Sequence, residues 1–244
     1  NGFYIDWGDG SSTVVTNKSQ LSHTYEKPGT YDILFRLLNG AADCFNGWTL
    51  KDNNKAQYLT HVLHWGSGLT INNTSYMFAG ATNLNYLNIA PNATQFVYDM
   101  SHMFEDATAF NQPVNFKTEN VTDMSYMFAG ATAFNQPVNF KTSRVTNMRS
   151  MFYHAFDFNQ PVNFDTSRVT DMYSMFYNAY AFNRPVNFDT RNVTTMEGMF
   201  YQATAFNQPV NFDTGNVTNM RYMFFNTKTF NQPVNFDTRN VTTM

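Results

Sequence analysis

The chain has little charge, almost no cysteine and no long apolar run. Only 14% of its 244 residues are charged, the formal net charge is −3, and Cys44 is the single cysteine. The basic excess that neutralises nucleic-acid phosphates is missing, so we expect no nucleic-acid partner. One cysteine excludes an internal disulfide framework. No stretch reaches the roughly 18 to 20 consecutive apolar residues of a spanning helix, so we expect no membrane span in this segment.

What the chain has in abundance is repetition. The heptapeptide "FNQPVNF" begins at Phe110 and returns, with at most one change, every 24 residues. The later copies begin at Phe134, Phe158, Phe182, Phe206 and Phe230. A fixed period in the twenties is typical of a solenoid, in which each repeat forms one coil and buries its apolar face against its neighbours. Function is then expected on the stacked surface.

The sequence divides into three regions. Residues 1–40 contain short β-branched and aromatic runs between Gly-Asp-Gly and Pro-Gly turn signals, which predicts strands and hairpins. Residues 41–70 show no period and are interpreted as a linker and an N-terminal cap. Residues 71–244 form the array, with one divergent unit, six 24-residue units and a stub. Because the chain starts inside what looks like a domain and ends at Met244, four residues into a repeat, we expect it to be a piece of a longer protein.

Apolar residues in the aperiodic region are sufficient to cover the first coil. They are Trp48, Leu50, Tyr58, Leu59, Val62, Leu63 and Trp65. The same region contains His61 and His64, which lie three residues apart. Without a third ligand at zinc-like spacing, we interpret them as ordinary packing or surface histidines.

Each repeat contains two patterns of apolar residues. In "VTDMSYMFAGA", the residues Val121, Met124, Met127, Phe128 and Ala131 recur at helical intervals, which predicts a helix of about two turns. Thr122 stands where a helix N-cap is expected. In "PVNF", Val114 and Phe116 alternate with Asn115 in the manner of a half-buried strand that begins at Pro113. We therefore predict an α/β repeat solenoid, a leucine-rich-repeat-like right-handed coil with short parallel strands and short helices.

Two stretches resemble known families. The phrase "VTDMSYMFAGATAFNQPVNF" is similar to the BspA-like leucine-rich repeats of bacterial surface proteins and lipoproteins, whose units read V-T-x-M-x-x-M-F followed by F-N-Q. "DWGDG" and "HTYEKPGTYDI" resemble the end of a polycystic-kidney-disease-type (PKD-like) β-sandwich, which implies a β-sandwich fragment in residues 1–40. Together the resemblances imply an extracellular or cell-surface protein, often an adhesin, and they carry over no catalytic residue.

The residues themselves also give no active-site pattern. The sequence contains no Gly-rich phosphate loop, no nucleophile elbow and no metal-ligand cluster. Asp6 and Asp9 admit a calcium site, but an Asp-Gly turn whose carboxylates bond backbone amides is the favoured interpretation, because calcium needs six or more oxygens. We therefore expect no enzyme, no catalytic residue, no metal and no cofactor.

The outward side of the predicted strand is the favoured ligand-binding surface. Its amide column is Asn139, Asn163, Asn187 and Asn211, and its charged column is Lys117, Lys141, Asp165, Asp189, Asp213 and Asp237. Nearby arginines, Arg144, Arg168, Arg191 and Arg239, or bound calcium would offset the repulsion between neighbouring carboxylates. The change from lysine to aspartate presents a charge gradient that would fix the direction of a bound protein or glycan.

Three further columns are candidates for a functional surface. The aromatic stripe Tyr153, Tyr177, Tyr201 and Phe225 either widens the core or forms an exposed binding strip. The asparagine column that begins at Asn111 is expected to be structural, with amides that bond backbone groups. The threonine column that begins at Thr118 admits an ice-binding interpretation, which the turn position disfavours.

The function predicted from the sequence is non-enzymatic. We expect a cell-surface or secreted repeat protein that mediates adhesion or binds a protein or glycan through its stacked surface. The alternative is a self-associating structural component of a surface layer or extracellular filament, in which the partners are sister molecules. Asn120, Asn192, Asn216 and Asn240 stand in N-x-T context and would carry glycans if the source glycosylates.

Overall fold

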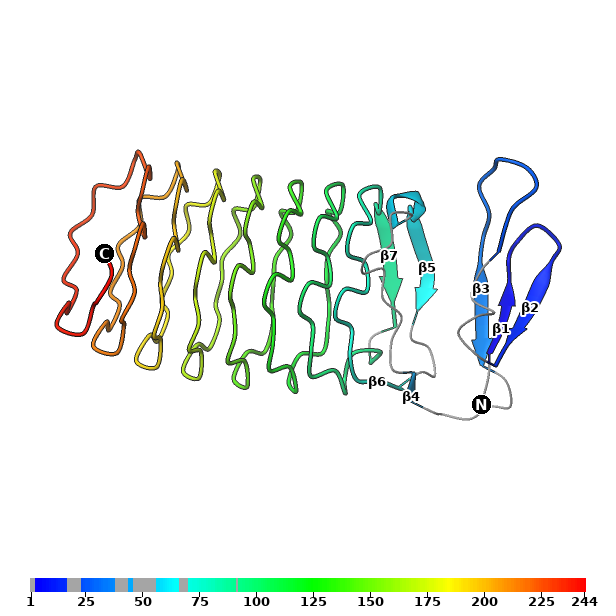
Figure 1. Ribbon diagram of the computed structural model, residues 1–244, viewed down its shortest axis with the longest axis horizontal. Helices are drawn as coiled ribbons and strands as arrows, with labels where there is room; N and C mark the ends of the chain where they lie inside the picture. The colour runs from blue at the N-terminus through cyan, green and yellow to red at the C-terminus, as the bar shows by residue number, and fades with distance from the viewer. Residues whose placement is uncertain (1–2, 17–22, 38–43, 46–55, 66–69, 91) are drawn as a thin grey trace. The chain divides into compact units, whose positions relative to one another are not determined.

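The computed structural model describes residues 3–16, 23–37, 44–45, 56–65, 70–90 and 92–244. The chain forms two compact units, Asn1–Asp43 and Cys44–Met244, which are taken in turn. Figure 1 shows the first unit as strands β1 to β3 and the second as a series of coils.

The first unit is a three-stranded antiparallel sheet in the order β2-β1-β3, with β1 at Phe3–Asp6, β2 at Ser12–Val15 and β3 at Leu34–Leu37. The described residues of this unit form one sheet, so they do not make the two packed layers of a sandwich. Its "DWGDG" turn needs glycine, because Gly8 has φ 78° and a Cβ there would lie 2.5 Å from the carbonyl oxygen of Asp32. Ile5, Trp7 and Val15 form its small core.

The stretch expected to be a cap pairs with the first coil of the array. Strand β4 (Cys44–Phe45) pairs in parallel with β6 (Thr70–Ile71), and β5 (His61–Trp65) pairs in parallel with β7 (Tyr86–Ile89). A 3-10 helix, η2, lies between them at Ala56–Tyr58.

Only some of the expected cap residues cover the core. Leu59 and Val62 pack against it, whereas Tyr58 and Leu63 are exposed, so the cap prediction is wrong for these two residues. Trp48 and Leu50 lie outside the described residues, as do the side chains of His64 and Trp65.

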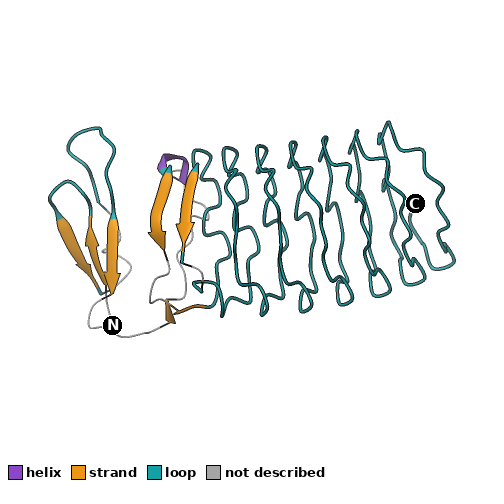
Figure 2. Ribbon diagram, turned by 180° about the vertical axis from the view of Figure 1, so that it is seen from behind, coloured by secondary structure: helices purple, strands orange, loops and turns teal. Residues whose placement is uncertain are grey.

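From Ile71 onward, one coil per repeat stacks on the next, as Figure 2 shows from behind. Parallel bridges link one residue of each coil to its counterpart in the following coil. They run in the order Asn73, Asp99, Asp123, Asn147, Asp171, Thr195, Asn219 and Thr243. This column lies one residue after Thr122 and its counterparts, in the segment predicted to be helical.

The predicted helix is absent. The described residues contain no α-helix, and the α/β class with short helices is therefore wrong. Met124, Tyr126, Phe128 and Gly130 donate their N–H groups to carbonyls of the next coil, whereas Met127, Ala129 and Ala131 donate to the carbonyl three residues earlier. Tyr126 (φ 56°) and Gly130 (φ 69°) adopt left-handed conformations. The chain thus makes a succession of tight turns in which alternate amides bond to the neighbouring coil.

Helical periodicity misled because it reports burial and not the backbone path. Met124, Met127 and Phe128 are fully buried, as the helix prediction required. Tight turns also return the chain to the same side every three or four residues. The expected N-cap is wrong as well, because the Thr122 hydroxyl donates to the carbonyl of Tyr98 (3.1 Å) and Asp123 Oδ1 accepts the N–H of Ser125 (2.8 Å) instead.

The predicted parallel strand at "PVNF" is also wrong. Among the described residues, the N–H groups of Val138, Asn139 and Phe140 have no acceptor, and the segment forms no ladder. The coils are joined on either side of it by side chains. For example, Asn111 Oδ1 accepts the N–H of Asn135 (3.0 Å), and Thr118 Oγ1 accepts the N–H of Lys141 (2.8 Å). The in-and-out alternation remains, with Val138 and Phe140 buried and Asn139 exposed.

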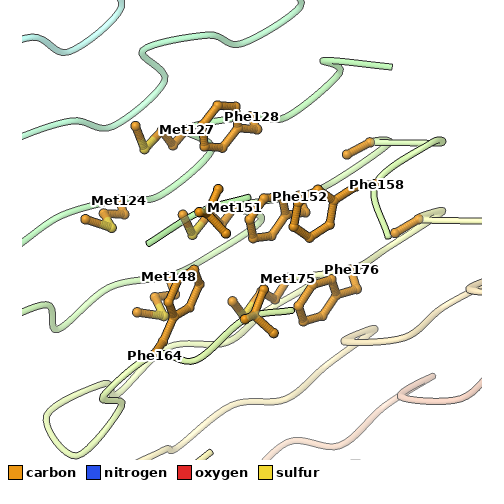
Figure 3. Close-up of a cluster of buried hydrophobic side chains, with 14 of the residues drawn as sticks. Met124, Met127, Phe128, Met148, Met151, Phe152, Phe158, Phe164, Met175 and Phe176 are labelled. Atoms are coloured by element: carbon orange, nitrogen blue, oxygen red, sulfur yellow. The ribbon is translucent and has the colours of Figure 1, made fainter. Parts of the chain in front are cut away.

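The core of the array is a continuous column of Met and Phe side chains. Figure 3 shows Met151 and Phe152 between the corresponding pairs of the neighbouring coils. The ring centroids of Phe128 and Phe152 lie 5.7 Å apart, with planes within 4° of parallel. Each coil therefore presents the same side chains to the next one, and no coil has a core without its neighbours.

Candidate binding surfaces

The "PVNF" segments and the residue after each form an exposed surface, here called the PVNF face. Asn139, Asn163, Asn187 and Asn211 are exposed on it. Their side-chain amides bond to none of the described residues. Each amide keeps two donors and an acceptor available to a ligand.

The aspartates of this face serve the turn that follows it. Asp165 Oδ1 accepts the N–H of Ser167 (3.1 Å), and Asp213 Oδ1 accepts the N–H of Gly215 (3.0 Å). The hydrogen bond from the Ser167 side chain lowers the pKa of Asp165, and that from Arg239 lowers the pKa of Asp237 to about 2. The carboxylates of Asp165 and Asp237 are therefore ionised at neutral pH and held in fixed positions.

Arginines form salt bridges with two of the four carboxylates. Arg191 pairs with Asp189 (2.5 Å) and Arg239 with Asp237 (2.6 Å), as expected. The expectation is wrong for Arg144, which donates to Asn120 Oδ1 (3.2 Å). These exposed ion pairs contribute little to stability, because solvent screens them.

Lysines occupy the same column in two earlier coils. Lys117 and Lys141 are exposed, and their ammonium groups pair with none of the described residues. The sign of the column changes between Lys141 and Asp165. The PVNF face is therefore uniform in its amides and variable in its charge.

The aromatic stripe is a stack of half-buried rings. The Tyr177 and Tyr201 centroids lie 4.2 Å apart with planes within 2° of parallel, and Tyr153 stacks on Tyr177 at 4.9 Å. Burial, together with the hydrogen bond with Tyr201, raises the pKa of Tyr177 to about 12. Ring faces in such a stack cover each other, so a ligand would meet mainly ring edges. Phe225, at the end of the stack, is 52% exposed.

Large side chains change column within the array, a feature that sequence reasoning missed. In the first coils His102 stacks between Tyr76 (4.1 Å) and Tyr126 (4.6 Å). The aromatic stripe occupies the column three residues after that of Tyr126, and its first ring is Tyr153. Comparing "SYMFA" with "RSMFY" in the sequence shows this exchange of large and small residues, because one position gains a ring where the other loses it.

A polar cluster lies beside this change, and it too was missed. Asp106 extends its carboxylate over Gly130, where a Cβ would lie 2.1 Å from Asp106 Oδ1. Asn178 Nδ2 lies 3.0 Å from His154 Nε2. Burial raises the pKa of Asp106 and lowers the pKa of His154. The cluster could have been found in the sequence as one variable column, which contains in successive repeats Asp106, Gly130, His154 and Asn178.

The remaining asparagine and threonine columns are structural. Asn159 Oδ1 accepts the N–H of Asn183 (3.1 Å), which confirms the expected role of the Asn111 column. The Thr118 hydroxyl is buried and donates to the carbonyl of Lys141 (3.1 Å). In the next coil the Thr142 hydroxyl donates in the same way to the carbonyl of Asp165. A buried column cannot present hydroxyls to ice, so this interpretation falls.

The carboxylates of the first unit form turns. Asp6 Oδ1 accepts the N–H of Gly8 (3.0 Å), and Asp9 Oδ1 accepts the N–H of Ser11 (3.0 Å). Asp9 Oδ2 also lies 2.7 Å from His23 Nε2. The Asp-Gly turn interpretation is therefore confirmed. In the part of the chain that the structure describes, no group of three or more His, Cys, Asp or Glu side chains is placed to hold a metal ion.

Two further expectations concern membrane spans and the paired histidines. None of the helices among the described residues has the length and apolar character needed to cross a membrane. His61, one of the paired histidines, lies with Nδ1 3.0 Å from the Thr60 hydroxyl, which is an ordinary surface contact.

The stacked coils define a repeat protein whose variable side chains lie on its surface. The model of one family, described as "Mycoplasma protein of unknown function, DUF285", matches residues 72–185 and 162–244. The chain belongs to this family, and the match covers the array. No curated protein and no solved structure matches the chain.

Proposed function

We propose that the chain is a non-enzymatic binding module of a secreted or cell-surface protein, and that it holds a protein or glycan along the PVNF face. The observation that carries the proposal is the row of unbonded, exposed amides of Asn139, Asn163, Asn187 and Asn211. Packing accounts for the buried columns, because every coil meets the same neighbour. Packing gives no reason for an outward amide that bonds to none of the described residues.

Charge along the same face supports a directional partner. The cations of Lys117 and Lys141 precede the carboxylates of Asp165 and Asp213, which form no salt bridge with an arginine in the part of the chain that the structure describes. A ligand of complementary charge order would bind in one orientation. Adhesion to cells is the form of this function that the resemblance to bacterial surface repeats favours.

The test is a charge reversal that leaves the coil intact. Asp213→Lys removes the hydrogen bond from the Gly215 N–H but no salt bridge within the described residues, and lysine already occupies this column in two coils. We expect weaker attachment to cells and a changed salt dependence. Asp157→Lys, an exposed position outside the PVNF face, is the matched control with the same change in net charge. Equal attachment by wild type and both variants would contradict the proposal.

A second candidate, self-association, is favoured by the uniformity of the face. Proline and asparagine stand at the same exposed positions in successive coils, from Pro113 and Asn115 onward. Such a surface would suit sister molecules in a layer or filament. Sedimentation of the purified chain over a range of concentrations separates the two, because a monomer at all concentrations supports the binding module.

A further inference from the structure

Two aromatic side chains break the polar pattern of the array's outward surface. Phe96 and Tyr98 are 51% and 49% exposed, while Val97 between them is fully buried. In the following coils the corresponding pairs are polar. They are Asn120 and Thr122, Arg144 and Thr146, Arg168 and Thr170, Asn192 and Thr194, Asn216 and Thr218, and Asn240 and Thr242. The exposed rings are therefore a departure from the repeat at one place.

The backbone beneath the two rings is fixed on both sides. Tyr98 donates its N–H to the carbonyl of Asn72 (3.0 Å), and its own carbonyl accepts the N–H (2.8 Å) and the hydroxyl (3.1 Å) of Thr122. Asn120 Nδ2 donates to the carbonyl of Gln95 (2.9 Å). Because neighbouring coils hold this segment, the outward direction of the rings is a property of the fold and not of a loose end.

Both rings are free of other interactions within the described residues. Neither Phe96 nor Tyr98 stacks on another aromatic ring or on a cation there, and the Tyr98 hydroxyl makes no hydrogen bond. This contrasts with Tyr177 and Tyr201, which cover each other. Ring faces that can receive a ligand are thus present at this pair and are covered in the stripe.

We propose that Phe96 and Tyr98 form a carbohydrate-binding platform that stacks against the C–H face of one neutral sugar ring. At half exposure two aromatic side chains offer roughly 150–250 Å² in total. A stable protein partner buries about 800 Å² per side around an apolar centre, so the apolar patch is far smaller than such an interface. One pyranose ring matches it in size.

The surroundings of the platform suit the hydroxyls of a sugar. The Asn120 amide and the Thr122 hydroxyl, which donate to the carbonyls of Gln95 and Tyr98, border it, and the Tyr98 hydroxyl, unbonded among the described residues, adds a donor and an acceptor. Arg144 donates to Asn120 Oδ1 (3.2 Å), which fixes the orientation of that amide. The inference rests on the proposed binding function and names its ligand class, but it uses a surface beyond the turn that ends the PVNF face.

The experiment uses an array of oligosaccharides of glucose, galactose, mannose and N-acetylglucosamine as the probe, followed by calorimetry on those that bind. The variant Phe96→Asn with Tyr98→Thr should weaken binding roughly tenfold or more, because it removes both rings. It should fold normally, since Asn-Val-Thr is the natural sequence of residues 192–194. Thermal denaturation checks this.

Two further variants make the test specific. The exchange Phe96→Tyr with Tyr98→Phe keeps both rings and should retain binding. The variant without both rings, Phe96→Asn with Tyr98→Thr, is here called the ring-less variant. Addition of Asn192→Phe with Thr194→Tyr to it should restore oligosaccharide binding. Retention of binding by the ring-less variant, or failure of the wild type to bind any of the oligosaccharides, would overturn the inference.

The outcome is separable from that of the proposed PVNF face. If Asp213→Lys retains oligosaccharide binding and the ring-less variant loses it, the platform stands, and the PVNF face is judged by the attachment of Asp213→Lys and Asp157→Lys to cells. Loss in Asp213→Lys alone would overturn the platform and leave the proposed function in place. Capture of a protein through the two rings, with no oligosaccharide bound by wild type, would also overturn it.

Discussion

The two sides of each coil are held to their neighbours by different means. On the side that contains Met124 and Phe128, alternate backbone N–H groups bond directly to the next coil. On the PVNF side, side chains such as Asn111 and Thr118 make the connections. Ring spacing differs accordingly, because Phe128 and Phe152 lie 5.7 Å apart and Phe140 and Phe164 lie 6.4 Å apart.

This difference shows how one repeat can combine a fixed frame with an accessible surface. A backbone bond between coils is independent of residue type, so the side chains on that side vary, as Ala129 and Tyr153 do. Side-chain bonds require particular residues, so Asn135 and Thr142 recur in every coil on the PVNF side. The constancy of the Asn135 and Thr142 columns is therefore explained by the missing ladder.

Hydrogen exchange should give the largest contrast between the two sides. The N–H of Phe152 donates to the carbonyl of Met175 (3.0 Å), whereas the N–H of Phe164 has no acceptor among the described residues. We expect Phe152 to exchange roughly a hundredfold or more slowly than Phe164, because it exchanges only when coils separate. NMR on the native protein measures both amides in one sample. Equal protection would show that the PVNF side is bonded as tightly as the other.

Replacement of a buried ring should cost the most stability on the PVNF side. Phe164→Ala removes a buried ring that stacks on Phe140, and we expect a loss of about 3 to 5 kcal/mol in the free energy of unfolding. Asn163→Ala, at the adjacent exposed position, should change it by less than about 0.5 kcal/mol. Urea denaturation compares the two variants. Similar losses would mean that the inward and outward sides are assigned wrongly.

The inward and outward positions followed from the sequence, but the backbone did not. Alternation at Val138, Asn139 and Phe140 fixes which side chains are buried in either a strand or an irregular segment. Whether a ladder forms depends on the spacing between coils, which a single repeat does not encode. Likewise, the interval between Met124 and Phe128 fits a helix and a series of turns equally well. The left-handed position in this turn is occupied by Tyr126 and not by a glycine, so the sequence gives no sign of the turn.

The candidate surfaces were predictable to a similar degree. Column arithmetic placed Asn163 and Asp165 outward and identified the stripe at Tyr177. It could not show that the Tyr177 and Tyr201 rings cover each other, because ring orientation depends on packing. Phe96 and Tyr98 were passed over because they lie in the divergent unit and the unit after it, where alignment to the repeat is least obvious.

Loss of one side-chain link should have a smaller effect than loss of a buried ring. Asn159 accepts the N–H of Asn183 (3.1 Å) and also donates its own N–H to Asn135 Oδ1 (3.0 Å). Asn159→Ala leaves the Asn183 N–H without that acceptor, and we expect a cost of about 1 to 2 kcal/mol. Asn187→Ala, at an exposed amide that bonds to no described residue, is the matched control. If the two variants unfold at the same urea concentration, the side-chain links do not hold the coils.

The smallest expected effect is a pH dependence of opposite sign on the two sides. On the PVNF side, the hydrogen bond from Arg239 lowers the pKa of Asp237 to about 2. Its folded-state pKa lies below the ordinary value of 3.8, so its contribution to stability is present above pH 3.8 and is lost as the pH falls toward 2. On the other side, burial raises the pKa of Asp106, so the ionised carboxyl opposes folding at neutral pH and acidification relieves this.

Carbon NMR of the carboxyl groups tests directly the order in which Asp106 and Asp237 protonate. On lowering the pH from 7, Asp106 should protonate before Asp237, and Arg239→Ala should raise the pKa of Asp237 toward 3.8 while leaving that of Asp106 unchanged. Both groups are accessible to water, and Asp237 is too exposed for its shift to be a large part of the stability. Protonation in the reverse order would mean that burial beside Gly130 does not act on Asp106. The two sides would then differ in their hydrogen bonds but not in their electrostatic environment.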